Sequence, residues 1–247
     1  MIKRLVFAVI MMALPAPVVM AQHQEGWVDD YRGVIGNHKI GISIMVLGSD
    51  VSGEYFYLRW LKDIPIKGKI NGRKIVLNEL DEKGKVVAVF DGHFPEHANV
   101  IEGEWFRPKG TERKKFRVLL EDSVGLTGDN RYYVAGFNNV QSVETVALQF
   151  KKAVIAENRE KVASLVLYPV SVKINGKRVE IMNMADFIQR YEAIFNRAFF
   201  DRIKESVPHN MFVKAEGVML GDSGEIWIGK RGGKARIIAI NNDVKGL

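Results

Sequence analysis

The chain has 247 residues, a formal net charge of +7 and no cysteine. The lack of cysteine excludes thiol nucleophiles, thiolate metal sites and disulfides, so the fold must rely on packing alone. Removal of the first 21 residues, whose only charges are Lys3 and Arg4, would lower the net charge to +5. That mildly basic balance is not typical of a nucleic-acid-binding protein, and we expect no nucleic-acid partner.

The N-terminus has the three parts of a cleavable signal peptide over residues 1–21. Lys3 and Arg4 precede an apolar run from Leu5 to Leu14, and small or modest side chains lead to a cut between Ala21 and Gln22. The run is shorter than the roughly 20 apolar residues that span a bilayer, although a retained N-terminal anchor is the alternative. We expect a bacterial periplasmic or secreted protein whose mature chain has no membrane span.

Residues 22–122 show apolar side chains at every second position, which is the pattern of β-strands. Turn signals such as Asn71-Gly72 separate the runs. Consecutive strands with tight turns predict an antiparallel meander, and eight strands are enough for such a sheet to close into a small barrel. The predicted strands are 31–36, 39–47, 52–60, 63–70, 73–80, 85–93, 99–106 and 114–121.

A glycine followed by aromatic residues recurs in this half, in Gly53-Glu54-Tyr55-Phe56-Tyr57 and in Gly103-Glu104-Trp105-Phe106. This pattern resembles that of small eight-stranded barrels of the avidin and lipocalin kind. The resemblance implies an architecture and no ligand residues. We interpret Tyr55, Tyr57, Arg59 and Trp105 as a candidate partner surface, because exposed aromatic residues favour interfaces, with ordinary barrel decoration as the alternative.

Residues 123–140 are rich in glycine, aspartate and asparagine and are predicted to be a linker. Residues 141–247 then change period. Apolar spacing of three and four predicts a helix over 142–156, a short helix capped by Asn158, and a third helix from Asn183 towards Ile203. A hairpin with an Asn175-Gly176 turn precedes the third helix, and three strands are predicted over 211–220, 225–229 and 235–241.

This order of helices, hairpin, helix and strands resembles the nuclear-transport-factor-2-like family, a cone-shaped α+β fold. The resemblance is carried by Val162-Ala163-Ser164-Leu165-Val166-Leu167-Tyr168-Pro169, by the Asn-Gly hairpin, by Gly217–Gly221 with Glu225–Ile228, and by Ile238–Asn241. It implies three helices on a curved antiparallel sheet. It is silent on function, because this cone hosts enzymes and non-enzymes alike.

No catalytic constellation is recognisable in the sequence. The acid and base that isomerases of this cone use have no counterpart, and nucleophile-elbow, phosphate-loop and dinucleotide patterns are missing. His93 and His97 flank Pro95, which forbids the helix that would present them as a ligand pair. We therefore predict no metal, no cofactor and no catalytic residue, and we lean against an enzyme.

The leading hypothesis is an exported non-enzymatic binding protein that acts on a protein or an envelope component, with an inhibitor or immunity protein as one form. Short basic groups such as Lys151-Lys152 are interpreted as solvated ends of elements, with an acidic partner as the alternative. The second hypothesis is a small-molecule binding protein or enzyme that uses the cone interior, lined by Tyr168, Tyr191 and Trp227. A homodimer is left open.

Overall fold

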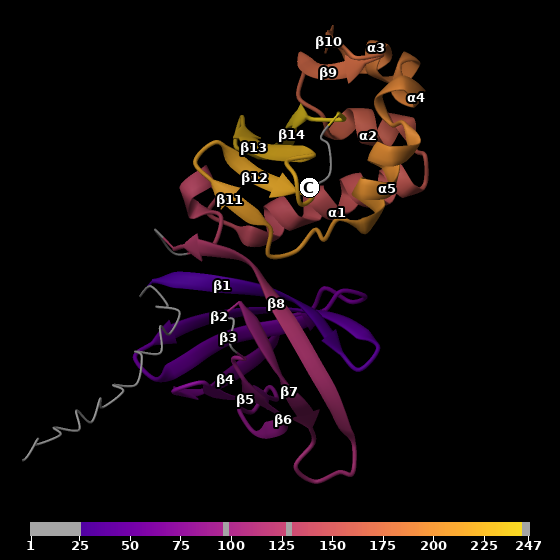
Figure 1. The fold of residues 1–247 in the computed structure, drawn as a ribbon. Coiled ribbons are helices and arrows are strands. Elements are labelled where there is room, and N and C mark those ends of the chain that lie inside the picture. The colour runs from indigo at the N-terminus through magenta and orange to yellow at the C-terminus, as the bar shows by residue number, and fades with distance from the viewer. Residues whose placement is uncertain (1–25, 96–98, 127–129, 244–247) are drawn as a thin grey trace, which may run out of the picture.

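A computed structural model describes residues 26–95, 99–126 and 130–243. The chain forms a β-barrel and a second domain of helices and sheets stacked against it (Figure 1). The predicted signal peptide, with its cut between Ala21 and Gln22, lies outside the described residues. Within the described residues, no helix is both long enough and apolar enough to cross a membrane.

The predicted antiparallel barrel is confirmed. Each strand pairs with the next along the chain, and β8 pairs back with β1 to close the sheet. At Gly53 a Cβ atom would lie 2.0 Å from the carbonyl oxygen of Ser43, so only glycine fits where these two strands meet. The strands are β1 (Trp27–Ile35), β2 (His38–Leu47), β3 (Asp50–Tyr57), β4 (Ile64–Asn71), β5 (Lys74–Leu80), β6 (Val86–His93), β7 (Val100–Phe106) and β8 (Arg113–Gly125).

The interior of the barrel is a packed apolar core. Tyr55 and Trp105 belong to this core, with 1% and 3% of their surface exposed, and Phe90 packs edge-on against Tyr55 at 5.1 Å between ring centroids. This corrects the sequence-based surface, which placed Tyr55 and Trp105 outside. Successive side chains of a strand point to opposite faces. Assigning the wrong face to the barrel interior therefore exchanges the inward and outward side chains along the whole strand. Phe56 consequently points outward and is covered by the second domain.

The second domain begins earlier than the sequence suggests. Strand β8 runs to Gly125, and the segment predicted as a linker contributes Tyr132 and Phe137 to the core of the second domain. The Asn130 side chain holds this segment in a turn: it accepts from Tyr132 N at 2.9 Å and donates to Phe137 O at 3.1 Å. Residues 130–139 are therefore packed structure that joins the two domains.

Helices precede and follow a two-stranded hairpin, and a four-stranded antiparallel sheet closes the second domain. Asparagines cap several helices, because their side-chain oxygens accept from exposed backbone N–H groups. The elements are η1 (Tyr133–Ala135), α1 (Val140–Ile155), α2 (Arg159–Leu165), β9 (Val170–Ile174), β10 (Lys177–Ile181), α3 (Met184–Gln189), α4 (Tyr191–Ile194), α5 (Arg197–Glu205), β11 (Phe212–Lys214), β12 (Gly217–Leu220), β13 (Ile226–Arg231) and β14 (Lys234–Ile240).

Two predicted elements of this domain are divided. The single helix expected from Asn183 is three helices, because Asn196 caps a new helix by accepting from Phe199 N at 3.1 Å. The strand expected over 211–220 is the hairpin of β11 and β12. The α+β composition agrees with the sequence, whereas the resemblance to the nuclear-transport-factor-2-like cone stays a prediction.

Candidate functional site at the seam between the domains

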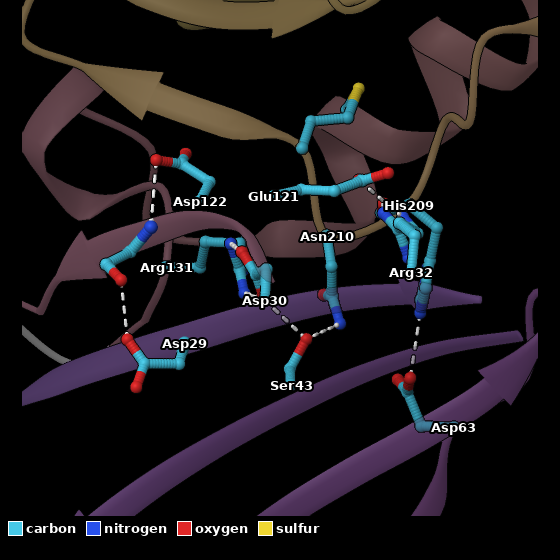
Figure 2. Close-up of polar contacts among 12 residues, drawn as sticks. Asp29, Asp30, Arg32, Ser43, Asp63, Glu121, Asp122, Arg131, His209 and Asn210 are labelled. Atoms are coloured by element: carbon cyan, nitrogen blue, oxygen red, sulfur yellow. Dashed lines mark hydrogen bonds and ion pairs between the residues drawn. The ribbon is translucent and has the colours of Figure 1, made fainter. Parts of the chain in front are cut away.

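Polar side chains are buried where the barrel meets the second domain, a region that we call the seam (Figure 2). Burial of polar groups is costly unless they are hydrogen-bonded, so their partners show what the seam does. The barrel supplies residues from β1, β2 and the turn before β4, and the second domain supplies residues from α1 and the segment between α5 and β11. Among the buried polar side chains are Asp30, Ser43, Glu144, His209 and Asn210.

An ion pair forms the first part of the seam. Arg131 donates from both terminal nitrogens to the two carboxylate oxygens of Asp30, each at 2.6 Å. Both side chains are less than 10% exposed. Ser43 donates to Asp30 at 2.6 Å and accepts from the Asn210 side chain at 3.0 Å. The barrel, the joining segment and the second domain therefore share one hydrogen-bonded chain.

The second part of the seam is a set of contacts to the carboxylate of Glu144 on α1. Its Oε1 accepts from the Tyr132 hydroxyl at 3.0 Å and from Asn210 N at 2.9 Å. Its Oε2 lies 2.7 Å from His209 Nδ1. The Tyr132 hydroxyl in turn accepts from Met211 N at 2.9 Å. Three separate stretches of the second domain therefore meet at one buried carboxylate.

His209 links this carboxylate to the barrel. Its Nε2 lies 2.7 Å from Oδ1 of Asp63, and its ring packs edge-on against Phe56 at 4.3 Å between centroids. Arg32 donates to the His209 carbonyl at 3.1 Å and lies over the Phe56 ring at 4.9 Å. Asn210 adopts a left-handed φ of 46°, which asparagine tolerates better than most residues. The segment after Pro208 is thus held against the barrel from several sides.

The charge state of the seam follows from these contacts. Burial by itself would lower the pKa of His209, but the hydrogen bonds to Asp63 and Glu144 outweigh it and raise the pKa to about 9. His209 is therefore a cation at neutral pH that donates from both ring nitrogens. Burial also raises the pKa of the Tyr132 hydroxyl, and the Glu144 charge adds to that effect.

These groups are arranged to hold the domains together. Both nitrogens of His209 are engaged by carboxylates, and the Ser43 hydroxyl is engaged by Asp30 and Asn210. These contacts join side chains of the barrel to side chains of the second domain and fix one domain against the other.

Several hollows lie along the seam, and two of them differ in the charge of their linings. One, the acidic cleft, has a volume of about 810 Å³ and includes Glu121, Asp122 and Asp222 in its lining. The other, the basic groove, has a volume of about 640 Å³ and lies between the β3–β4 turn and helices α1 and α5. The two hollows share Lys39 and Glu205 in their linings, so they adjoin along the seam.

The basic groove combines cations with an aromatic wall. Its lining carries a single acid, Glu205. Tyr57 packs edge-on against Trp60 at 5.1 Å and against His38 at 6.0 Å between ring centroids. Trp60 is 63% exposed at the mouth of the groove. The basic side chains in the lining are Lys39, Arg59, Lys151, Lys152 and Lys204.

The predicted partner-surface residues divide between the core and this groove. Tyr57 and Arg59 line the basic groove, whereas Tyr55 and Trp105 are buried inside the barrel. The strand pattern therefore does not show which of these side chains are accessible. Trp60, which is not part of the predicted partner surface, is the exposed aromatic residue of the groove lining.

The predicted cone-lining residues do not come together. Tyr168 and Tyr191 both pack on Phe187 in the helical core, and the Tyr168 hydroxyl donates to Ala163 O at 2.9 Å. Trp227 contacts Phe212 and Lys214 on the opposite face of the sheet, since its neighbours in β13 point into the core. The structure separates Trp227 from the two tyrosines.

Most of the seam escapes prediction from the sequence. The sequence favours a satisfied turn residue at His209, with a place in the cone mouth as the alternative, and it does not single out Asp30, Arg131 or Glu144. One signal is available, because Glu144 directly follows Val143 on the apolar side of the predicted helix 142–156. A carboxylate at the border of a buried helix face requires a partner, and here it has several.

Comparison with known proteins gives no family and no curated relative from which a function could be transferred. No protein-family model matches the chain, and no curated protein matches its sequence. The seam and the hollows along it are therefore the features from which a function can be inferred.

Proposed function

We propose that this protein is an exported, non-catalytic binding protein whose partner, a protein or an envelope component, lies along the seam between its two domains. The observation that carries the proposal is the basic groove, which residues of both domains line. Export rests on the N-terminal sequence. An inhibitor or immunity protein, which occupies a charged surface of its target, is one form of this function.

The seam network supports the proposal because it holds the walls of the groove in place before a partner binds. Asp30, Arg131, Glu144 and His209 hold the barrel and helix α1 in one arrangement. Binding costs conformational entropy when a surface must become ordered, and a preformed groove avoids much of that cost. A hydrogen-bonded network at the domain boundary therefore favours recognition by a fixed surface.

The composition of the groove supports a macromolecular partner. Tryptophan, tyrosine and arginine are the residues that protein interfaces favour, and the groove contains one of each in Tyr57, Arg59 and Trp60. The groove is partly open to solvent, so a segment of a larger partner can enter it.

The test uses the absence of cysteine from the chain. A single cysteine introduced at Asn37→Cys, on the rim of the basic groove, can carry a benzophenone maleimide. Lys177→Cys, exposed on the β9–β10 turn, is the matched control. After ultraviolet illumination in an envelope extract of the source cell, we expect a discrete adduct from position 37 and none from position 177. Equal adducts from both positions, or none from either, would contradict the proposal.

A further inference from the structure

We infer that the basic groove binds an extended acidic segment of a partner protein, in which apolar side chains are interspersed with carboxylates; this rests on the proposed binding function. The partner class follows from three features of the lining: uncompensated positive charge, exposed apolar surface and concave shape. A ligand that matched only the charge, only the apolar surface or only the shape would leave part of the groove without complementary contacts.

The positive charge of the groove is not neutralised within the described residues. No ion pair there reaches Lys39, Arg59, Lys152 or Lys204, although acids elsewhere on the surface pair widely. Like charges gathered around one hollow repel one another, and the Debye length of about 8 Å at physiological salt lets them act on the same ligand. Carboxylates in the groove would relieve this repulsion.

Lys151 adds a cation at a less exposed position. Its Nζ donates to the carbonyl of Ser206, just after α5, at 2.6 Å. Burial lowers the pKa of Lys151, because the charged amine loses hydration in the groove. A carboxylate that entered the groove beside Lys151 would restore favourable interactions to that charge, so this position favours an anionic side chain of the ligand.

Exposed apolar side chains exclude a purely ionic ligand. Trp60 and Ile155 are 63% and 42% exposed on opposite sides of the groove. The turn that presents Trp60 includes Leu61, whose left-handed φ of 51° is uncommon for a residue other than glycine. Leu61 N and Trp60 N both donate to Tyr57 O, each at 2.9 Å, and these bonds hold the turn. The ligand must therefore also offer apolar groups to the tryptophan.

The shape of the groove selects a peptide over a membrane or a sugar chain. Leu148 and Val207 are half-buried in the lining, so a flat bilayer would not reach them. Five basic side chains against a single acid in the lining favour an acidic ligand over a neutral sugar chain. An extended peptide can direct alternate side chains to the apolar floor and to the basic rim.

The experiment measures fluorescence anisotropy of the full mature chain with a labelled twelve-residue peptide in which glutamates alternate with leucines and phenylalanines. A peptide with lysine in place of every glutamate is the charge control. We expect the glutamate peptide to bind and the lysine peptide not to bind. Affinity should fall at least tenfold in Lys152→Glu/Lys204→Glu and in Trp60→Ala, whose side chains are exposed, so the fold is kept.

The matched control is Lys177→Glu/Lys234→Glu, which reverses two exposed lysines on turns outside the groove lining and should stay within twofold of the wild type. Equal losses in both double variants would overturn the inference, as would groove-dependent binding of polygalacturonate or of phosphatidylglycerol vesicles without binding of the peptide. If no peptide binds but the cross-link at position 37 forms, the acidic-segment inference is wrong and the proposed binding function stands.

Groove-dependent peptide binding without any cross-link would support the acidic-segment inference and contradict the proposed envelope partner.

Discussion

The barrel interior and the seam are both buried, yet the first consists of apolar side chains and the second of charged and polar ones. The barrel interior is apolar and packed with rings such as Tyr31, Phe90 and Phe116. The seam is filled with charges that satisfy one another, among them Asp30, Arg131 and His209. Apolar packing fills the barrel interior, whereas ion pairs and hydrogen bonds hold the second domain against the barrel. Buried polar networks can serve specificity in this way.

The largest effect should come from breaking the buried ion pair of the seam. Arg131→Met would leave Asp30 as an uncompensated charge, which typically costs about 3 to 5 kcal/mol. Urea unfolding followed by circular dichroism measures this loss. The double variant Asp30→Asn/Arg131→Met should recover a large part of it, because the stranded charge is gone. A single variant within about 1 kcal/mol of the wild type would mean that the pair does not hold the seam.

Two phenylalanines sharpen the contrast between barrel and seam. Phe56→Ala removes a fully buried ring beneath His209, and Phe90→Ala removes one inside the barrel. Each should cost about 3 kcal/mol or more. Only Phe56→Ala should also change the titration of His209, measured by nuclear magnetic resonance of the imidazole. If Phe90→Ala shifted that titration as strongly, the two regions would not be independent.

The stability of the seam should depend on pH through His209. Its folded pKa of about 9 lies above the usual value of 6.5, so its contribution is fully present below pH 6.5 and is lost as the pH rises through 9. The shift corresponds to about 3 kcal/mol at most. The difference in unfolding free energy between the wild type and His209→Gln should therefore shrink between about pH 6 and pH 9.5. A constant difference would show that the cation does not stabilise the seam.

The smallest expected effect concerns the alternative small-molecule site. The Tyr191 hydroxyl is buried and has no hydrogen-bond partner among the described residues. Tyr191→Phe should therefore keep or raise the unfolding free energy, by up to about 1 kcal/mol, because it removes an unsatisfied polar group. Thermal unfolding measures this change, with Tyr168→Phe as a control that loses a hydrogen bond to Ala163 O. A clear loss of stability in Tyr191→Phe would reveal a partner for that hydroxyl.

The sequence predicts the elements better than their faces. Alternating apolar residues locate the barrel strands to within a few residues, because the closed barrel depends on local pairing of consecutive strands. The same alternation places Tyr55 outside and Phe56 inside, since both faces of β3 are apolar where the second domain covers the barrel. The seam could not be predicted, because its partners, such as Asp63 and His209, are brought together only by the docking of two domains.

The claim on which both proposals depend is that the groove exists before any partner arrives. Nitroxide labels at Lys67→Cys on the barrel and Lys177→Cys on the second domain, both exposed, report the distance between the domains by pulsed electron resonance. We predict one narrow distance distribution, unchanged by the glutamate peptide and broadened by Arg131→Met. A broad or two-peaked distribution in the wild type that narrows only with peptide would contradict a preformed groove.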